Sequence, residues 1–404
     1  MSRIQRAAKP TTCLVLTTLL LSLSGCMQVA HRGVPLPKEL SDKAQIAGIP
    51  NARIWGDEQP PKWGELTTAS EQTLAARFSG IMNREHRYLA LSGGGANGAF
   101  GAGLLAGWTA AGTRPEFTIV TGVSTGSLIA PFAFLGSEYD TRLKELYTQF
   151  STDDMVKKKK LWNIIRNDGA VSVAPMKAIL AEFYNEDVVD AIAREGRKGR
   201  LLRVGTTNLD AGRPVIWDIA AIAASEHPDR VELIQRIILA SCSIPVGFPP
   251  VFFEVEANGQ TYDEMHVDGG VANQVFLYPA EIKWQPVLDK FKVKGQPRVY
   301  VIRNSHVHSH WQETKPRLTA IAGRSVDSLI RTQGIGDMYR IYLESERDNL
   351  DFNLAFIPPE FTEKPKETFD VEIMKELYDL GYKMARDGYV WHKTPPEFVT
   401  HDDQ

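Results

Sequence analysis

Two glycine-rich turns, each following an apolar run, constrain the fold of this chain most strongly. The first lies in Tyr88–Gly103, YLALSGGGANGAFGAG, and the second in Phe117–Gly136, FTIVTGVSTGSLIAPFAFLG. Glycine destabilises the interior of helices and strands, so clustered glycines indicate turns where the backbone approaches another group closely. The small and apolar residues after each turn predict helices packed against a sheet. Strand, helix, strand, helix in this order predicts an α/β fold with a mostly parallel sheet.

Later segments extend the pattern. Strands are expected at 201–209, 213–219, 266–271 and 298–304, and helices at 141–150, 175–184, 232–241 and 277–284. After about Asn304 the chain changes character: 317–349 predicts a long or broken amphipathic helix, 353–358 a last strand and 370–388 a last helix. We therefore expect a catalytic domain over 85–304 and a C-terminal, mainly helical extension over 305–404.

Composition indicates an ordinary globular protein. Hydrophobic residues make up 43% of the 404 residues and charged residues 24%, with a formal net charge of −3. The length is sufficient for one large domain or two moderate ones. A mildly acidic chain is a poor candidate for nucleic-acid binding, which needs a basic surface.

The N-terminus resembles a bacterial targeting segment. Arg3, Arg6 and Lys9 precede the short apolar run CLVLTTLLLSLSG, a pattern typical of a signal peptide rather than of a membrane span. The run ends in LSGC, which resembles a lipoprotein cleavage box with Cys26 as the lipidated residue. A plain signal peptide with an incidental cysteine is the alternative. By the same resemblance, Met27 favours the outer membrane.

These observations set the expected organisation before the catalytic domain. Residues 1–25 are expected to be the signal peptide, and 26–84, rich in Pro and Gly, a tether and lead-in with a short helix near Ser70. Of the three cysteines, Cys13 would leave with the peptide and Cys26 would carry lipid, so Cys242 would have no disulfide partner. A lipid on Cys26 would tether the protein to a membrane.

The second turn carries a candidate nucleophile. GVSTG, Gly122 to Gly126, places Ser124 where a strand meets a helix, the setting of a nucleophile elbow. Gly122 and Gly126 flank the serine because a Cβ would crowd the turn. The helix that begins at Thr125 would direct free N–H groups toward the reacting centre. The alternative is a glycine-bracketed turn with a helix-capping serine.

The first turn is a candidate oxyanion loop. Gly93, Gly94 and Gly95 follow a strand and can present backbone N–H groups with no side chain in the way. The same glycines match the G-x-G-x-x-G dinucleotide fingerprint. That fingerprint requires an acidic residue near the end of the second strand, and TIVTGVSTG has none. The nucleotide-binding interpretation is therefore the weaker one, and no cofactor is expected.

HVDGGV, His266 to Val271, supplies a candidate base. Asp268 ends a short β-like run and precedes two glycines, and a carboxylate can deprotonate a serine hydroxyl within hydrogen-bond reach. Taken alone, Asp-Gly-Gly is simply a turn.

GGGANG, GVSTG and DGG in this order resemble the patatin-like phospholipases. TTNLDAGRPVIWD and ASCSIPVGFPPV between them agree, and the resemblance covers about Tyr88 to Pro279. It implies a three-layer α/β/α fold, a Ser124–Asp268 dyad without histidine or metal, an oxyanion hole at Gly93–Gly95, and hydrolysis of lipid acyl esters through an acyl-enzyme. One departure is Asn97, where the family often has Arg or Lys.

Four other interpretations stay open at this point. The order Ser124, Asp268, then His306, His308 or His310 also fits a Ser–His–Asp hydrolase, and HVHSH is a conceivable metal site or an exposed strand end. Lys157–Lys160 followed by LWNIIRN is either a membrane-contacting segment or a solvated helix face. A lipid-binding lipoprotein that lost its chemistry is the non-enzymatic alternative. The specific lipid, the physiological role and the oligomeric state are not encoded in any motif.

Overall fold

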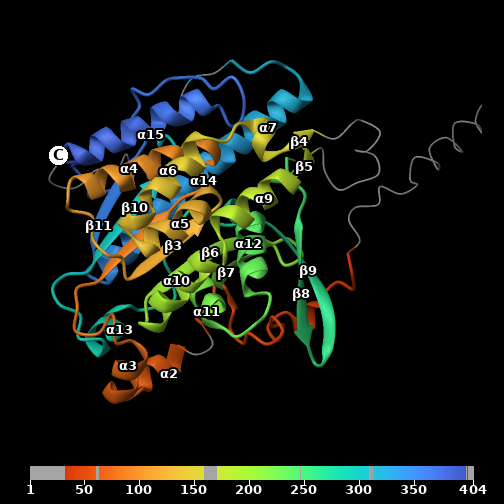
Figure 1. Ribbon diagram of the computed structural model, residues 1–404. Helices are drawn as coiled ribbons and strands as arrows, with labels where there is room; N and C mark the ends of the chain where they lie inside the picture. The colour runs from red at the N-terminus through yellow and green to blue at the C-terminus, as the bar shows by residue number, and fades with distance from the viewer. Residues whose placement is uncertain are drawn as a thin grey trace, which may run out of the picture.

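A computed structural model describes residues 32–60, 63–158, 171–245, 247–308, 311, 313–396 and 398. Cys26, the expected signal peptide, His310 and most of Lys157–Asn167 lie outside the described residues. The described part forms one layered unit (Figure 1) with helices on both faces of a central sheet. None of its helices has the length and apolar character needed to cross a bilayer.

The central sheet has the strand order β1-β7-β6-β3-β2-β10-β11. β6, β3, β2, β10 and β11 run parallel, whereas β7, β1 and β9 pair antiparallel with their neighbours, and β8 pairs only with β9. The fold is therefore the expected three-layer α/β/α type with a mostly parallel sheet. The strands are β1 (Arg53–Trp55), β2 (Arg87–Leu91), β3 (Ile119–Val123), β6 (Leu201–Asn208), β7 (Arg213–Asp218), β8 (Val251–Ala257), β9 (Gln260–Asp268), β10 (Arg298–Arg303) and β11 (Asp351–Phe356). A separate two-stranded sheet joins β4 (Lys157–Lys158) to β5 (Val171–Ser172).

Helices cover the two faces unequally. The larger apolar layer lies between the sheet and α4 (Gly98–Ala110), α5 (Thr125–Leu135), α6 (Asp140–Thr148), α9 (Ala174–Phe183), α10 (Glu186–Arg197), α11 (Ile219–Ala224), α12 (Arg230–Ser241) and α15 (Val371–Arg386). The other face packs against α14 (Leu318–Arg347). Shorter helices are α2 (Trp63–Thr68), α3 (Glu71–Arg77), α7 (Thr152–Met155) and α13 (Gln285–Lys290).

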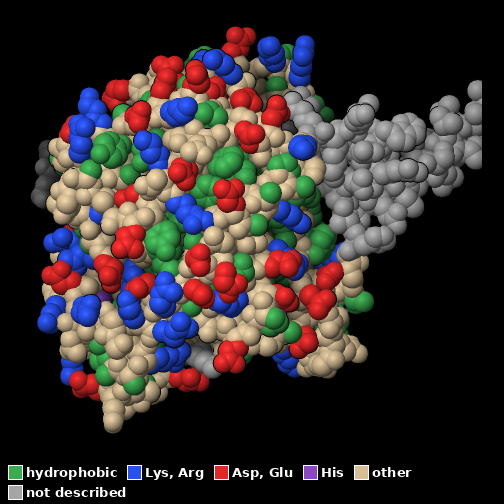
Figure 2. Space-filling view, in the orientation of Figure 1, with side chains coloured by type: hydrophobic (Ala, Val, Ile, Leu, Met, Phe, Trp, Pro, Cys, Tyr) green, Lys and Arg blue, Asp and Glu red, His purple; other side chains and the backbone are tan. Residues whose placement is uncertain are grey.

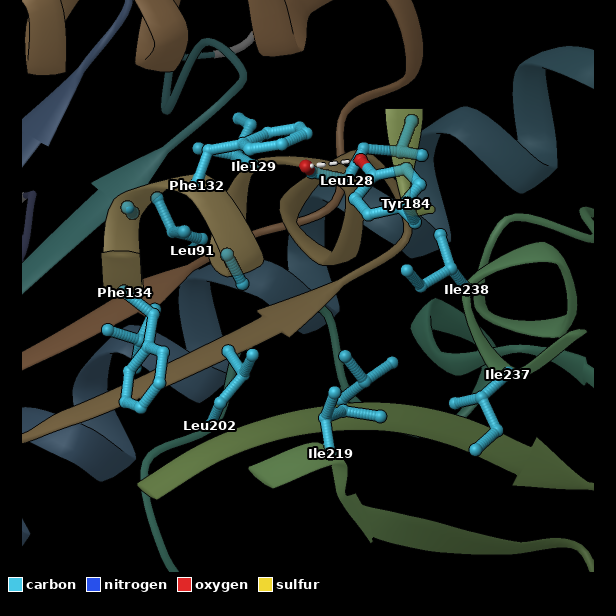
Figure 3. Close-up of a cluster of buried hydrophobic side chains, with 14 of the residues drawn as sticks. Leu91, Leu128, Ile129, Phe132, Phe134, Tyr184, Leu202, Ile219, Ile237 and Ile238 are labelled. Carbon is cyan, nitrogen blue, oxygen red and sulfur yellow. Dashed lines mark hydrogen bonds between the residues drawn. The ribbon is translucent and has the colours of Figure 1, made fainter. Parts of the chain in front are cut away.

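The core follows the alternation of side chains along the strands. In β2, Leu89 and Leu91 face the α4–α5 layer, while Tyr88 and Ala90 face the α14 layer. Figure 3 shows part of the larger layer, to which β2 contributes Leu91, α5 contributes Phe132 and α12 contributes Ile238. Charged side chains of both signs are mixed over the face seen in Figure 2, as expected for a small net charge.

The C-terminal region is integral to this unit. β11 extends the sheet beside β10, and α15 lies directly against α4. The two helices meet at glycines: a Cβ on Gly103 would lie 1.9 Å from the Tyr378 carbonyl oxygen, and one on Gly381 would lie 2.3 Å from the Phe100 carbonyl oxygen. Helix α15 therefore fixes the helix that follows the candidate oxyanion loop.

Most expected elements occur within a few residues of their predicted bounds, with two exceptions. The helix expected at 277–284 is wrong: this stretch is irregular, and Pro279 interrupts any helical hydrogen-bond ladder. Its apolar residues, including Leu277 and Ile282, are buried against the sheet without helical periodicity. The sequence analysis predicts only the end of the β8–β9 hairpin, although its first strand alternates buried apolar and exposed charged residues as a half-buried strand does.

Candidate active site

Ser124 stands on a sharp turn between β3 and α5. Its backbone has φ 52° and ψ −124°, a left-handed conformation that costs a non-glycine residue about 1–3 kcal/mol. The Ser124 N–H donates to the Ser241 hydroxyl oxygen over 2.9 Å, and the Ser241 hydroxyl donates to the Gly205 carbonyl over 2.7 Å. These hydrogen bonds hold the Ser124 backbone in its strained conformation. Such strain is typical of residues at functional sites.

The glycines on either side of Ser124 are required by close backbone contacts. A Cβ on Gly122 would lie 2.3 Å from the Gly126 carbonyl oxygen, and a Cβ on Gly126 would lie 2.3 Å from the Leu91 carbonyl oxygen. No real Cβ tolerates such distances. The turn therefore lies directly against the end of β2, where the glycine loop begins.

Asp268 reaches the same rim of the sheet through strand pairing. Val123 of β3 pairs with Gly205 of β6, and the next β6 residue, Thr206, pairs with Asp268 of β9. Ser124 follows Val123 directly. The sheet register thus brings the serine and the carboxylate together from positions far apart in the chain.

The Asp268 carboxyl is buried and only partly satisfied. It is 5% exposed; its Oδ1 accepts the Gly270 N–H over 2.7 Å, and its Oδ2 is buried without a hydrogen bond of ordinary geometry. Burial raises the pKa of Asp268 to about 7, while the nearby Ser124 hydroxyl and the Gly270 N–H oppose the rise. Ser124 is therefore the side chain that lies close enough to the Asp268 carboxyl to influence its ionisation.

The glycine loop, Ser92–Gly95, lies beside Ser124. A Cβ on Gly93 would lie 3.3 Å from the Ser124 Cβ, and one on Gly94 would lie 2.0 Å from the Asn304 carbonyl oxygen. Asn304 also holds the loop through its side-chain amide, which donates to the Ser92 carbonyl over 2.9 Å. Gly95 has φ +57° and open space around its Cα.

The three glycines differ in which N–H groups are free. The Gly93 N–H donates to the Gln274 carbonyl over 3.0 Å, so it is engaged within the protein rather than available to a ligand. Among the described residues, the N–H groups of Gly94, Gly95 and Thr125 donate no backbone hydrogen bond. Thr125 is the first residue of α5, so its N–H has no partner within the helix.

Several supporting residues were not predicted from the sequence. Gln274 connects the two loops, since its carbonyl accepts from Gly93 and its side-chain amide donates to the Gly270 carbonyl. Asp337 of α14 accepts the Gln274 N–H over 2.7 Å. Tyr147 of α6 donates to the Thr125 carbonyl over 2.9 Å. No local motif marks these side chains, because their roles depend on contacts across the chain.

An apolar pocket opens at Ser124. Its lining combines the reactive turn with side chains from several elements and is almost wholly hydrophobic: Gly95, Ala96, Ser124, Thr125, Leu128, Leu146, Tyr147, Met155, Met176, Cys242, Ile244, Phe248, Phe369 and Met374. Phe369 and Met374 come from the C-terminal region. Such a lining favours an apolar group over a polar one.

His266 and His308 have partners other than Asp268. The His266 ring contacts the Thr206 hydroxyl at 2.9 Å and Glu264 at 3.2 Å, and burial lowers its pKa. His308 is exposed and faces Phe356. The side-chain and backbone groups that shift the pKa of Asp268 are Ser124 and Gly270, with no imidazole among them. The described residues contain no group of three or more His, Cys, Asp or Glu side chains suited to a metal ion.

A comparison with protein families gives a match over the part of the chain that carries this site. A model of the patatin-like phospholipase family matches residues 89–281, which include both glycine turns, Ser124 and Asp268. A search of curated protein sequences gives no significant match. Among solved structures, VipD from Legionella pneumophila matches with 12% sequence identity over 76% of this chain and 67% of that chain, at a TM-score of 0.36. By this match, residues 89–281 are a patatin-like phospholipase domain.

Proposed function

We propose that this protein hydrolyses lipid acyl esters with a Ser124–Asp268 dyad and a backbone oxyanion hole. Family membership implies a lipid acyl hydrolase, and the observation that carries the finer proposal is the convergence of the strained Ser124, the half-satisfied Asp268 carboxyl and two free loop amides beside an apolar pocket. The Ser–His–Asp and non-catalytic alternatives have no comparable support from the described residues.

The proposed reaction has two halves. Asp268 accepts the Ser124 hydroxyl proton as the serine oxygen bonds to the ester carbonyl carbon, and the N–H groups of Gly94, Gly95 and Thr125 bind the resulting oxyanion. Collapse of this intermediate breaks the ester C–O bond, and Asp268 returns the proton to the leaving alcohol. Water then attacks the acyl-enzyme with Asp268 again as the base, which releases the fatty acid and restores the hydroxyl.

The cellular setting is part of the proposal. The basic n-region, the short apolar run and LSGC support a lipid anchor on Cys26 and a place in the bacterial envelope, with Met27 favouring the outer membrane. The substrate would then be a membrane lipid near the anchor.

Mass spectrometry of products from a mixed bacterial lipid extract tests the function. Wild-type protein should release free fatty acids and the matching lyso-lipids, and Ser124→Ala should release neither. Equal product from both proteins would exclude Ser124 chemistry.

The pH dependence follows from the raised pKa of Asp268. A base must be ionised, so kcat/KM for a soluble ester should fall about tenfold per pH unit below a pKa near 7 and level off above it. Initial rates with a p-nitrophenyl ester, corrected for product ionisation, give this profile. An acid limb centred near pH 4 would show that burial does not tune this carboxyl.

Gly94→Ala tests the oxyanion loop. The added methyl group would overlap the Asn304 carbonyl, so the loop must move and its amides should miss the oxyanion. We expect kcat to fall by on the order of 10²-fold or more. Gly64→Ala is the matched control, because a Cβ there meets nothing within 4 Å. A folded Gly94→Ala protein, checked by circular dichroism, that keeps its kcat would remove the loop from the mechanism.

A further inference from the structure

The first half of α14 exposes an apolar stripe. Leu318 is 83% exposed, Leu329 69%, Ile321 49% and Val326 48%. With 3.6 residues per turn, these four side chains share one side of the helix. A row of large aliphatic side chains in water costs free energy, and soluble proteins use such patches mainly for binding.

The stripe does not continue the core-facing side of the helix. In the second half of α14, Met338 and Ile341 are buried against the sheet. Helical geometry places them on the side opposite Leu318 and Leu329. The apolar side of α14 therefore switches along its length, and the exposed half is patterned for a different partner from the sheet.

The C-terminal end of this exposed half contacts the loop that follows Asp268 in the active site. The Gln333 side-chain amide donates to the Ala272 carbonyl, and Asp337 accepts the Gln274 N–H. Both contacts lie just after Asp268. From Gln333 back to Leu318 the helix extends about 22 Å at 1.5 Å per residue. Its first turns reach the upper right edge of the molecule in Figure 1.

Charge favours an anionic partner. Arg324 and Arg331 lie seven residues apart and so share one flank of α14, and Arg317 stands at its N-cap. Lys315 precedes the helix, and between residues 313 and 333 the only acids are Glu313 and Asp327. An aliphatic stripe with arginines along its flank is the pattern of a helix that lies in a membrane interface.

We propose that the first half of α14 binds the surface of an anionic bilayer. Leu318, Ile321, Val326 and Leu329 enter the acyl boundary, while Arg317 and Arg331 contact lipid phosphates. Because α14 contacts the segment after Asp268, docking would bring the Ser124 pocket, whose lining includes the 39% exposed Ile244, toward the lipid surface. The purpose of docking rests on the proposed function, whereas the binding itself does not.

Vesicle binding of the full chain tests the proposal. All variants carry Cys26→Ser so that a lipid anchor cannot contribute. The Leu318→Ser/Val326→Ser/Leu329→Ser triple variant should bind phosphatidylglycerol-containing vesicles at least tenfold more weakly in co-sedimentation. Leu209→Ser/Val390→Ser is the matched control, since both residues are exposed aliphatics elsewhere, and it should bind as the parent does.

Charge and activity provide independent readouts. Arg317→Gln/Arg331→Gln should weaken binding about tenfold on anionic vesicles but little on phosphatidylcholine vesicles. The triple variant should hydrolyse a soluble p-nitrophenyl ester at the parental rate and vesicle phospholipid at least tenfold more slowly.

Each of three possible outcomes contradicts a different claim. A parent that hydrolyses neither substrate but shows the binding difference would overturn the proposed function alone. A triple variant with parental binding to vesicles would overturn the docking helix. A parental dimer in analytical ultracentrifugation that becomes monomeric in the triple variant, with unchanged vesicle binding, would assign the stripe to a second copy of this chain.

Discussion

Ser124→Ala is expected to lower kcat/KM for a soluble ester by about 10⁴-fold or more and to abolish covalent labelling by a fluorophosphonate. In the proposed mechanism the substitution removes the atom that forms the acyl-enzyme, and loss of a nucleophile typically removes nearly all chemical catalysis. The fold should be unaffected, because the bonds that hold the turn use the Ser124 backbone rather than its hydroxyl. Active-site titration, with labelled peptides identified by mass spectrometry, measures both effects.

Ser137→Ala is a suitable control for the labelling experiment. Ser137 is an exposed serine outside the pocket, so its variant should be labelled like the wild type. If Ser124→Ala retains labelling, another residue is the nucleophile and the strained turn has a different purpose.

Asp268→Asn is expected to lower kcat by at least about 10³-fold while the protein stays folded. The amide cannot accept the serine proton, yet its oxygen can still accept the Gly270 N–H as Oδ1 does now. The pH profile alone would not identify this base, because an imidazole also titrates near neutrality. His308→Ala is therefore the paired measurement, and it should leave kcat unchanged.

The same substitution should preserve or increase stability above neutral pH. The folded pKa of Asp268, about 7, exceeds the ordinary value near 3.8, so folding favours the protonated form. The ionised carboxylate therefore destabilises the fold, beginning above the unfolded pKa and reaching its full cost above pH 7. Asparagine carries no such charge, so its melting temperature at pH 8 should be no lower than that of the wild type. A large decrease there, or loss of activity in His308→Ala instead, would contradict the dyad.

The central part of the fold could be predicted because local pattern and tertiary position agree there. The apolar runs 88–91 and 117–123 are buried on both faces, as parallel strands require, and each ends in a glycine turn. The segment 277–284 misled the prediction, since its buried apolar residues serve an irregular chain around Pro279. Periodicity does not distinguish such a segment from a short buried helix.

The residues of the candidate site likewise fall into those that the sequence predicts and those that it does not. Ser124, the glycine turns and Asp268 lie in short motifs, so the sequence indicates them. The engagement of the Gly93 N–H by Gln274 could not be predicted, because it depends on how two loops meet. Likewise Phe369 and Met374 enter the pocket only because α15 packs on α4. The motifs predict a serine nucleophile and a carboxylate base, whereas the contacts of Gln274, Phe369 and Met374 depend on how the chain folds.

The place of β10 in the sheet has a consequence for how this protein can be shortened. The family match ends at residue 281, yet β10 pairs with β2, the strand that leads into the glycine loop. A fragment that stopped at the family boundary would leave β2 as an open edge with unpaired backbone groups, a template for aggregation. The last third of this chain therefore cannot be removed without exposing the strand that leads into the glycine loop.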